Sequence, residues 1–375
     1  MNEPPVFAAS LTIGLAMMLS LATLFQLFQR HIAGQPLLAY EPRRPAPWNA
    51  LPALVMLAPL LITWWVALTG SREADPATEI ASMIHAHATA SIGAPPACVF
   101  ATIAVDANTP YLLEPKAKAG ALTYALWLQS LTSISMAAIA YLLLAALFGA
   151  DGRDLGLPRD GRELLRDVKI GAAAWAASLA PIYGILFVLQ AIVEPESGHP
   201  LVQELVTDHS LSMMLAAGLA AVVAAPIYEE TVFRLLLQGW LERREMLAQP
   251  VIAHEILPPA YDDQFEREGE APAEPGSAYQ FSARQEPRPP DPEPSAAPQF
   301  TYTYAPPGWL PIIITSVLFG LAHYGHGVSP IPLILLGAVM GYLYQRTHRV
   351  TPSIVCHLLF NLFTFVLLAL QFAAV

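Results

Sequence analysis

Eight runs of apolar residues, separated by polar segments, constrain what this chain can fold into more than any other feature. The most uniform stretch, LSMMLAAGLAAVVAAP, covers residues 211–226 without a single charge. About 20 apolar residues in a helix cross a bilayer. Only 13% of the residues are charged, against about 25% in soluble domains. The sequence therefore predicts an all-α, polytopic integral membrane protein built as a helical bundle.

The apolar runs predict about eight transmembrane helices. They cover residues 6–28, 49–70, 120–149, 170–193, 211–234, 309–323, 330–345 and 353–374. The sixth and seventh are short, so a broken or partly submerged helix is an alternative there. Their connection, YGHGVS at 324–329, contains two glycines, and irregular backbone at membrane depth is tolerated where it lines a cavity.

Basic residues in the connecting loops predict the orientation. Arginines and lysines concentrate after the first, third, fifth and seventh spans, whereas 194–210 and 324–329 contain neither. By the positive-inside rule, the basic loops face the cytoplasm and both termini face outside. The N-terminus MNEPPV lacks a basic region, which favours a retained membrane helix over a cleaved signal peptide.

The chain divides into four regions. Residues 1–119 hold two helices and an extracytoplasmic loop, 120–247 hold three helices, and 309–375 hold the last three. The insert 248–308 contains thirteen prolines, ten acidic residues and three basic residues. Such a segment buries too little apolar surface to fold, so we expect a disordered cytoplasmic linker, with a docking segment for a partner as the alternative. The acidic, proline-rich composition of the insert favours a bacterial protein of the inner membrane. Because the insert holds most of the net charge of −11, that charge does not indicate a nucleic-acid partner.

A few ionisable and amide side chains lie within the apolar runs, where such groups are costly and tend to mark function. They are Glu229, Glu230, Arg234, His323, His357 and Asn361. The i, i+4 spacing puts Glu230 and Arg234 on one helix face, and His357 and Asn361 on another. Each has a structural alternative, as an ion pair at the membrane edge, a hydrogen-bonded core histidine or an interhelical amide link. Their occurrence on three separate apolar helices favours a polar site between those helices.

This combination of side chains can hydrolyse a peptide bond within the membrane. A glutamate can act as general base on water, and histidines with an asparagine can stabilise an oxyanion. Alternatively, Glu229, His323 and His357 can bind a divalent metal such as zinc in an open catalytic site, and spacing does not decide between a metal and none. The chain has no GxSG and no GxGD, and His254-Glu255 lacks the second histidine of an HExxH motif.

Three motifs together resemble those of the CPBP intramembrane proteases, also called the ABI or type II CAAX prenyl endopeptidase family. They are Glu229-Glu230-x-x-x-Arg234, Phe319-x-x-x-His323 and His357-x-x-x-Asn361. The flanking text FRLLLQGWL, FGLAH and GYLYQRTHRVTPSIVCHLLFN is similar as well. The resemblance covers roughly 170–247 and 309–375, and the insert 248–308 interrupts it.

The resemblance implies a role for each motif residue. Glu229 would activate the hydrolytic water, supported by the other two residues of its motif. His323 would hold the water or stabilise the oxyanion, and His357 with Asn361 would complete the oxyanion site. If the sixth span begins at the cytoplasmic face near Trp309, His323 lies about 21 Å further along it. It then meets Glu229 only if that helix is tilted, displaced outward or begins outside the bilayer.

The expected activity is an endopeptidase that cleaves a membrane-associated, hydrophobic or prenylated peptide or protein, with membrane lipid around it. Two alternatives from other classes remain open. One is a non-catalytic scaffold that binds hydrophobic peptide tails, and the other is a transporter that uses buried glutamate and histidine as a proton relay.

Overall fold

The computed structural model describes residues 4–58, 115–193, 210–249, 252–256, 299–324 and 329–372. The long helices in these ranges are α1 (Pro4–Ile32), α5 (Pro115–Phe148), α6 (Gly161–Ile192) and α13 (Val350–Phe372). Two shorter helices, α11 (Leu310–Leu321) and α12 (Pro330–Thr347), precede α13. Residues 51–58 are also helical.

The central element is a continuous helical run that carries the first motif. Its segments are α8 (Leu211–Gly218), η1 (Leu219–Ala224), α9 (Ala225–Glu230), η2 (Thr231–Gln238) and α10 (Gly239–Ala248), of which η1 and η2 are π-helical. Pro226, at the start of α9, has no N–H to give to the preceding turn, and such gaps accompany departures from regular α-helix. π-Helical turns are rare and occur often at functional sites. Here they lie on both sides of α9.

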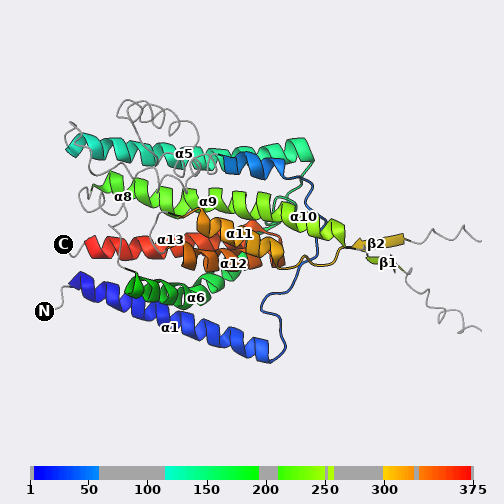
Figure 1. Cartoon of the computed structure of the whole chain (residues 1–375), viewed down its shortest axis with the longest axis horizontal. Helices are drawn as coiled ribbons and strands as arrows, with labels where there is room; N and C mark the ends of the chain where they lie inside the picture. The colour runs from blue at the N-terminus through cyan, green and yellow to red at the C-terminus, as the bar shows by residue number, and fades with distance from the viewer. Residues whose placement is uncertain are drawn as a thin grey trace, which may run out of the picture.

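The helices pack in layers, with α5 at one edge of the bundle and α1 at the other (Figure 1). The α8–α9 run packs on α5, α13 packs on α9 and α6, and α6 packs on α1. The hairpin of α11 and α12 lies between η2 and α6. Fully buried side chains in this interior include Leu179, Leu236, Phe319, Leu336 and Tyr344.

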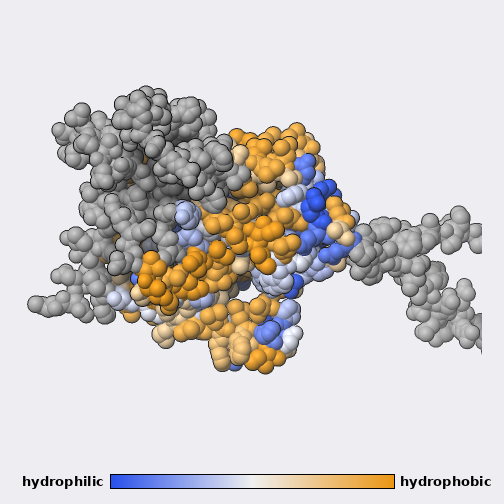
Figure 2. All heavy atoms as spheres, viewed as in Figure 1, coloured by the Kyte–Doolittle hydropathy of each residue, from blue (hydrophilic) through white to orange (hydrophobic). Residues whose placement is uncertain are grey.

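The outer surface of the bundle is apolar. Along α1, Leu15, Met18 and Phe25 each expose more than half of their surface, and apolar residues cover much of the face seen in Figure 2. Soluble monomers rarely expose contiguous apolar patches of this extent. The chain is therefore a helical membrane bundle, as the sequence predicts, and its outer face is suited to lipid.

All eight predicted apolar runs coincide wholly or partly with helices in the described ranges, but not all are long enough to cross a bilayer. Among the described residues, five helical segments are long and apolar enough to cross a bilayer. They are Ala8–Ile32, Leu122–Phe148, Gly161–Ile192, Leu211–Ala248 and Val350–Leu370. The predicted second span, 49–70, is described only to residue 58. Helix α11 has 12 residues and is about 18 Å long, less than the roughly 30 Å of a hydrocarbon core. The sixth run is therefore too short for a full span, and its position relative to the bilayer stays a prediction.

The loops predicted to share one side of the membrane lie at one end of the bundle. Arg44 in the 33–50 segment pairs with Asp151 and Asp154 in the loop before α6, and Glu41 pairs with Arg349 in the turn between α12 and α13. The N-terminus lies at the opposite end (Figure 1). This arrangement agrees with the predicted alternation of the loops, and the cytoplasmic location of the basic end stays a prediction.

Two short strands, β1 (Ile252–Ile256) and β2 (Gln299–Thr303), pair antiparallel within the predicted linker. No strand was expected there, because the prolines and charges hide any alternating pattern. The pair places Ile252 opposite Thr303, so the two ends of the insert lie side by side next to α10. Residues 257–298 and the loop predicted at 71–119, except its last five residues in α5, lie outside the described residues.

Local signals in the sequence explain where some elements begin and end. Asp160 caps α6 by accepting hydrogen bonds from the backbone N–H groups of Arg162 and Glu163, as short polar side chains do at helix N-termini. Ser210 caps α8 in the same way. At the end of α12, His348 adopts a left-handed conformation with φ of 52°, unusual for a non-glycine residue, and reverses the chain into α13.

Candidate active site

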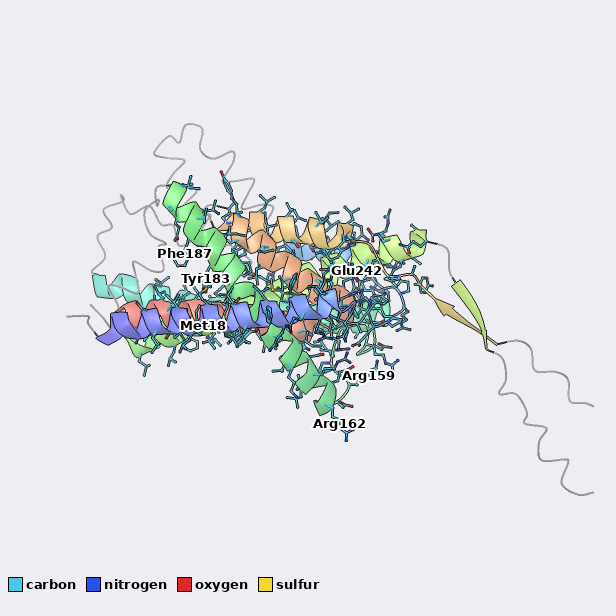
Figure 3. All side chains as sticks on the ribbon, turned by 90° about the horizontal axis from the view of Figure 1, so that it is seen from below. Met18, Arg159, Arg162, Tyr183, Phe187 and Glu242 are labelled. Atoms are coloured by element: carbon cyan, nitrogen blue, oxygen red, sulfur yellow. The ribbon has the colours of Figure 1, made fainter. Side chains whose placement is uncertain are left out.

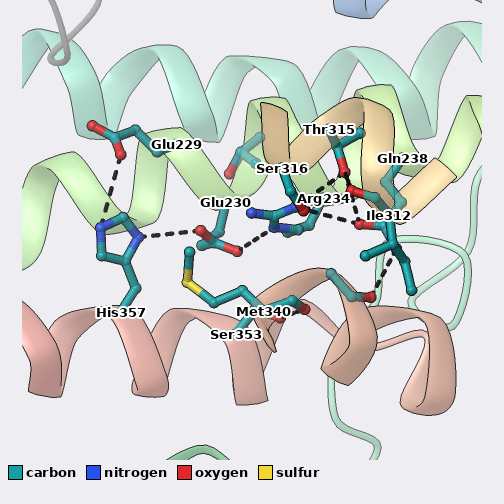
Figure 4. Close-up of polar contacts among 12 residues, drawn as sticks. Glu229, Glu230, Arg234, Gln238, Ile312, Thr315, Ser316, Met340, Ser353 and His357 are labelled. Carbon is teal, nitrogen blue, oxygen red and sulfur yellow. Dashed lines mark hydrogen bonds and ion pairs between the residues drawn. The ribbon is translucent and has the colours of Figure 1, made fainter. Parts of the chain in front are cut away.

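The two adjacent glutamates of the first motif are both buried at the end of α9. Glu229 is 3% exposed and Glu230 is fully buried. Consecutive residues on a helix point about 100° apart, so the two carboxylates address different neighbours. Figure 4 shows Glu230 between Arg234 and His357, and Glu229 on the far side of His357.

Glu230 has a partner on each of its carboxylate oxygens. Nε of Arg234 donates to Oε2 over 3.1 Å, and Nδ1 of His357, from α13, lies 3.1 Å from Oε1. Arg234 is itself fully buried, and its second guanidinium arm donates to Oγ1 of Thr315 on α11 over 3.2 Å. The predicted Glu230–Arg234 pair is therefore confirmed, and it ties the first motif to two other helices.

Glu229 is the less satisfied carboxylate. Its Oε2 has no hydrogen-bond partner among the described residues, and the nearest partner in an ion pair is Nε2 of His357 at 3.8 Å. That distance is too long for a direct hydrogen bond. The imidazole of His357 thus lies between the two carboxylates, with one ring nitrogen toward each (Figure 4).

His323 follows the end of α11, and its depth follows from the direction of that helix. Thr315 pairs with Arg234, and one turn later Phe319 contacts the rings of Phe233 and His357 at centroid distances of 5.4 and 5.5 Å. Helix α11 therefore runs antiparallel to the first-motif helix, so the next turn carries His323 further toward Glu229.

The ring of His323 lies 5.0 Å from that of Phe319, and Nδ1 lies 2.8 Å from the carbonyl oxygen of Phe319. A carbonyl oxygen only accepts, so Nδ1 carries the proton. The sequence left open how His323, far along the sixth span, could reach the depth of Glu229. The antiparallel direction and short length of α11 account for this approach.

Asn361 forms a hydrogen bond between two helices, which is the structural alternative that the sequence analysis gives for this residue. Its Nδ2 donates to the carbonyl oxygen of Ala221 in η1 over 2.8 Å, and the side chain is half-buried. This bond satisfies a backbone group in a π-helical turn. The role in the oxyanion site that the resemblance implies stays a prediction.

The proposed metal ligands do not gather into a metal site. Among the described residues no three histidine, cysteine, aspartate or glutamate side chains come close enough together to hold an ion. Glu229 and His357 lie side by side, but His323 does not complete a group of three with them. Three protein ligands are usual for catalytic zinc, so the arrangement does not fit a catalytic zinc ion.

Sequence reasoning missed a buried polar stripe that continues from Arg234. Gln238 donates to Oε1 of Glu242 over 2.9 Å and to the carbonyl oxygen of Gly341 over 2.8 Å. Glu242 in turn lies 3.4 Å from Arg43 and 3.6 Å from His348. The stripe connects the site to the basic end of the bundle.

A spacing signal could have found this stripe, because positions 230, 234, 238 and 242 are all polar and lie four residues apart. An α-helix would rotate every fourth residue by about 40° from the one before. The wider π turns of η2 reduce that drift and keep the stripe on one face.

The family comparison adds an independent observation on the same helices. Residues 297–363, which span α11, α12 and the first part of α13, match the family described as type II CAAX prenyl endopeptidase Rce1-like. This segment is similar to the Rce1-like family. The match confirms the resemblance that the motifs carry, and it supports a CAAX-protease-like membrane endopeptidase. No curated protein and no solved structure matches the chain.

Proposed function

We propose that the chain is an intramembrane endopeptidase in which Glu229 is the general base. One observation carries the choice of glutamate. Both oxygens of Glu230 are engaged, by Arg234 and His357, whereas Oε2 of Glu229 has no hydrogen-bond partner among the described residues. A general base needs a free oxygen within reach of the water that it deprotonates.

His357 orients the water in this proposal. Arg234 keeps Glu230 ionised, so Nδ1 of His357 donates to that carboxylate and Nε2 presents its lone pair toward Glu229. A polar gap of 3.8 Å suits two groups that share one water. The water donates one proton to Oε2 of Glu229 and the other to Nε2 of His357, which leaves an oxygen lone pair for attack on the scissile carbonyl carbon.

The remaining steps use groups on the same helices. Glu229 takes the proton as the C–O bond forms, and the carbonyl π electrons move onto the oxygen. Collapse of the tetrahedral intermediate breaks the C–N bond, and protonated Glu229 returns the proton to the leaving amine. The first proton of His323 is on Nδ1, so Nε2 donates to the oxyanion only in a ring that has taken a second proton from solvent.

The substrate class follows from the surroundings. The site lies within a bundle whose outer surface is apolar, so we propose a membrane-associated substrate with an apolar or prenylated segment. We place the protein in a bacterial inner membrane.

The test compares Glu229→Gln with a matched change of carboxylate to amide on the same helical run, Glu245→Gln. Membranes from cells that express each full-length variant are analysed for protein termini. Glu229→Gln should abolish specific cleavage, since a general base contributes about 10²- to 10⁴-fold, and uncleaved substrate should accumulate. Glu245→Gln should cleave as wild type does, and both should keep the wild-type melting temperature.

Unchanged termini in folded Glu229→Gln would contradict the proposal. A scaffold would still bind peptide tails in that variant, and a transporter would show pH-dependent flux that the variant loses. The same substitution therefore separates all three classes.

A further inference from the structure

A cavity of about 440 Å³ opens at the basic end of the bundle, away from the glutamate site. Its walls come from four segments that are far apart in the sequence: the 33–50 segment, the loop before α6 with the first turn of that helix, Tyr304 after β2, and the end of α12 with the turn into α13. The volume is within the range of ligand pockets, roughly 300–1,000 Å³. Neither the family match nor the three motifs assign it a role.

The charged side chains around the cavity include arginines at its rim that the carboxylates do not fully neutralise. Five arginines and four carboxylates line it. The carboxylates are engaged: Asp151 and Asp154 pair with Arg44, and Glu41 and Glu163 pair with Arg349.

Two arginines of the rim are less committed. Arg153 has no ion pair within 4 Å in the part of the chain that the structure describes, and Arg159 reaches Glu163 only at 4.0 Å, with 60% of its side chain exposed. These two side chains are free to take an external anion.

Hydrogen-bond donors at the buried wall of the cavity also lack partners. His348 is 4% exposed; its Nδ1 lies 3.6 Å from Oε2 of Glu242, beyond hydrogen-bond distance, and neither ring nitrogen has a hydrogen-bond partner among the described residues. Nε of Arg43 is buried and equally unpaired.

Burial lowers the pKa of His348 to about 4, although Glu242 works in the other direction. The ring is therefore neutral at pH 7 and adds no positive charge to the buried wall. Buried donors without partners are costly, and anionic oxygens are acceptors that satisfy them.

We propose that this cavity binds the phosphate of an anionic lipid headgroup, with Arg153 and Arg159 at the rim and His348 and Arg43 at the buried wall. Basic pockets between helices at a membrane surface are suited to such headgroups. This assignment concerns the basic end of the bundle and is independent of the proposed catalysis.

An apolar path beside the cavity favours a lipid over free phosphate. Leu157 lines the cavity and is 43% exposed. The first turns of α6 project from the bundle, with Arg162 near the tip in Figure 3, and they expose Leu164 and Leu165. Acyl chains can lie along these side chains while the phosphate occupies the cavity.

The test uses the full-length protein in detergent, titrated with dioleoyl phosphatidylglycerol and, separately, with dioleoyl phosphatidylcholine. Native mass spectrometry measures the dissociation constant of each. Each arginine near a membrane surface contributes about fivefold, so Arg153→Gln with Arg159→Gln should weaken phosphatidylglycerol binding roughly 30-fold. The matched control, Arg162→Gln, removes an exposed arginine from the same end of α6 without touching the cavity, and should change binding less than about twofold.

Three results would overturn the proposal. They are equal binding of the two lipids, no saturable binding of phosphatidylglycerol, and a loss in Arg162→Gln as large as in Arg153→Gln. Inorganic phosphate should not compete at concentrations similar to the lipid. If it does, the ligand is the free anion and the lipid assignment is wrong.

Discussion

Two neighbouring glutamates acquire different tasks because of where their side chains point. Glu230 faces the arginine one turn along its own helix and a histidine of α13, and both bonds measure 3.1 Å. A buried charge is tolerated when it is paired, and removal of one partner leaves the other charge uncompensated. The Glu230–Arg234 pair is therefore a structural requirement of the site, whereas Oε2 of Glu229, the proposed base, has no hydrogen-bond partner among the described residues.

Replacement of Arg234 alone with Met should destabilise the fold more than replacement of both Glu230 and Arg234. Arg234→Met leaves the charge of buried Glu230 with only His357 beside it, and we expect a cost of about 3–5 kcal/mol. The double variant Glu230→Gln with Arg234→Met has no such charge and should be more stable than the sum of the single effects, by about 0.5–3 kcal/mol. Thermal unfolding in detergent measures all four proteins of the cycle, and strict additivity would contradict the pairing.

The residue-scale predictions succeeded where partners are close in sequence. Glu230 and Arg234 are one turn apart, so helical spacing alone predicts their contact. The bond between His357 and Glu230 joins residues 127 positions apart; their common site was expected from polar groups on separate apolar helices and from the family resemblance, whereas the bond itself was not. Thr315 was missed because an isolated threonine in an apolar helix carries no spacing signal.

At the scale of elements, the close packing of α11 against α12 sets the depth of the second motif. A Cβ on Gly320 would lie 2.7 Å from the carbonyl oxygen of Pro330, so no other residue fits without a backbone shift. Helix α11 also carries Thr315 and Phe319, which contact Arg234 and His357. The position of this short helix therefore controls the site from one side.

Gly320→Ala should lower both stability and activity. Overpacking of this kind costs about 1–3 kcal/mol, and a displaced α11 would move Thr315 away from Arg234. The matched control is Gly184→Ala in α6, where an added Cβ meets nothing within 4 Å and should be neutral or stabilise by about 0.5–1 kcal/mol. Melting temperature and cleavage are measured on both variants. A Gly320→Ala protein as stable and active as Gly184→Ala would show that the hairpin tolerates a shift.

Element boundaries were predictable where hydrophobicity or capping marks them. The spans at 170–193 and 353–374 lie almost wholly within α6 and α13, since long apolar runs determine membrane helices. The π-helical character of η1 and η2 could not be predicted, because it depends on contacts across the bundle. The β1–β2 pair was missed for a related reason: strand pairing across 42 intervening residues leaves no local pattern.

At the scale of the whole molecule, one arginine joins three segments at the basic end. Arg349 lies between α12 and α13, and it pairs with Asp167 and Glu163 of α6 and with Glu41 of the 33–50 segment. Arg166 adds a second pair to Glu41 at 2.9 Å. Because Arg349 lies immediately before α13, which carries the third motif, this cluster helps to hold that helix against α6 and the 33–50 segment.

The cluster should make stability depend on pH in the acid range. Burial acts to raise the pKa of Glu41, but the hydrogen bond and charges of Arg349 and Arg166 outweigh it and hold that pKa below the ordinary value of 4.5. A lowered pKa in the folded state contributes stability that is present above the unfolded pKa and is lost as pH falls through the folded one. The melting temperature of wild type should therefore drop as pH falls below about 4.5.

Glu41→Gln isolates this contribution, because glutamine keeps the shape of the side chain and cannot titrate. The variant should melt below wild type at pH 7, where the paired charge is missing. Its melting temperature should then fall less steeply than that of wild type between pH 5 and pH 3, so the two curves converge at the acid end. Parallel curves over that interval would show that Glu41 does not link the 33–50 segment to the helices through its charge. High salt should narrow the gap at pH 7, since the pair is only partly shielded from solvent.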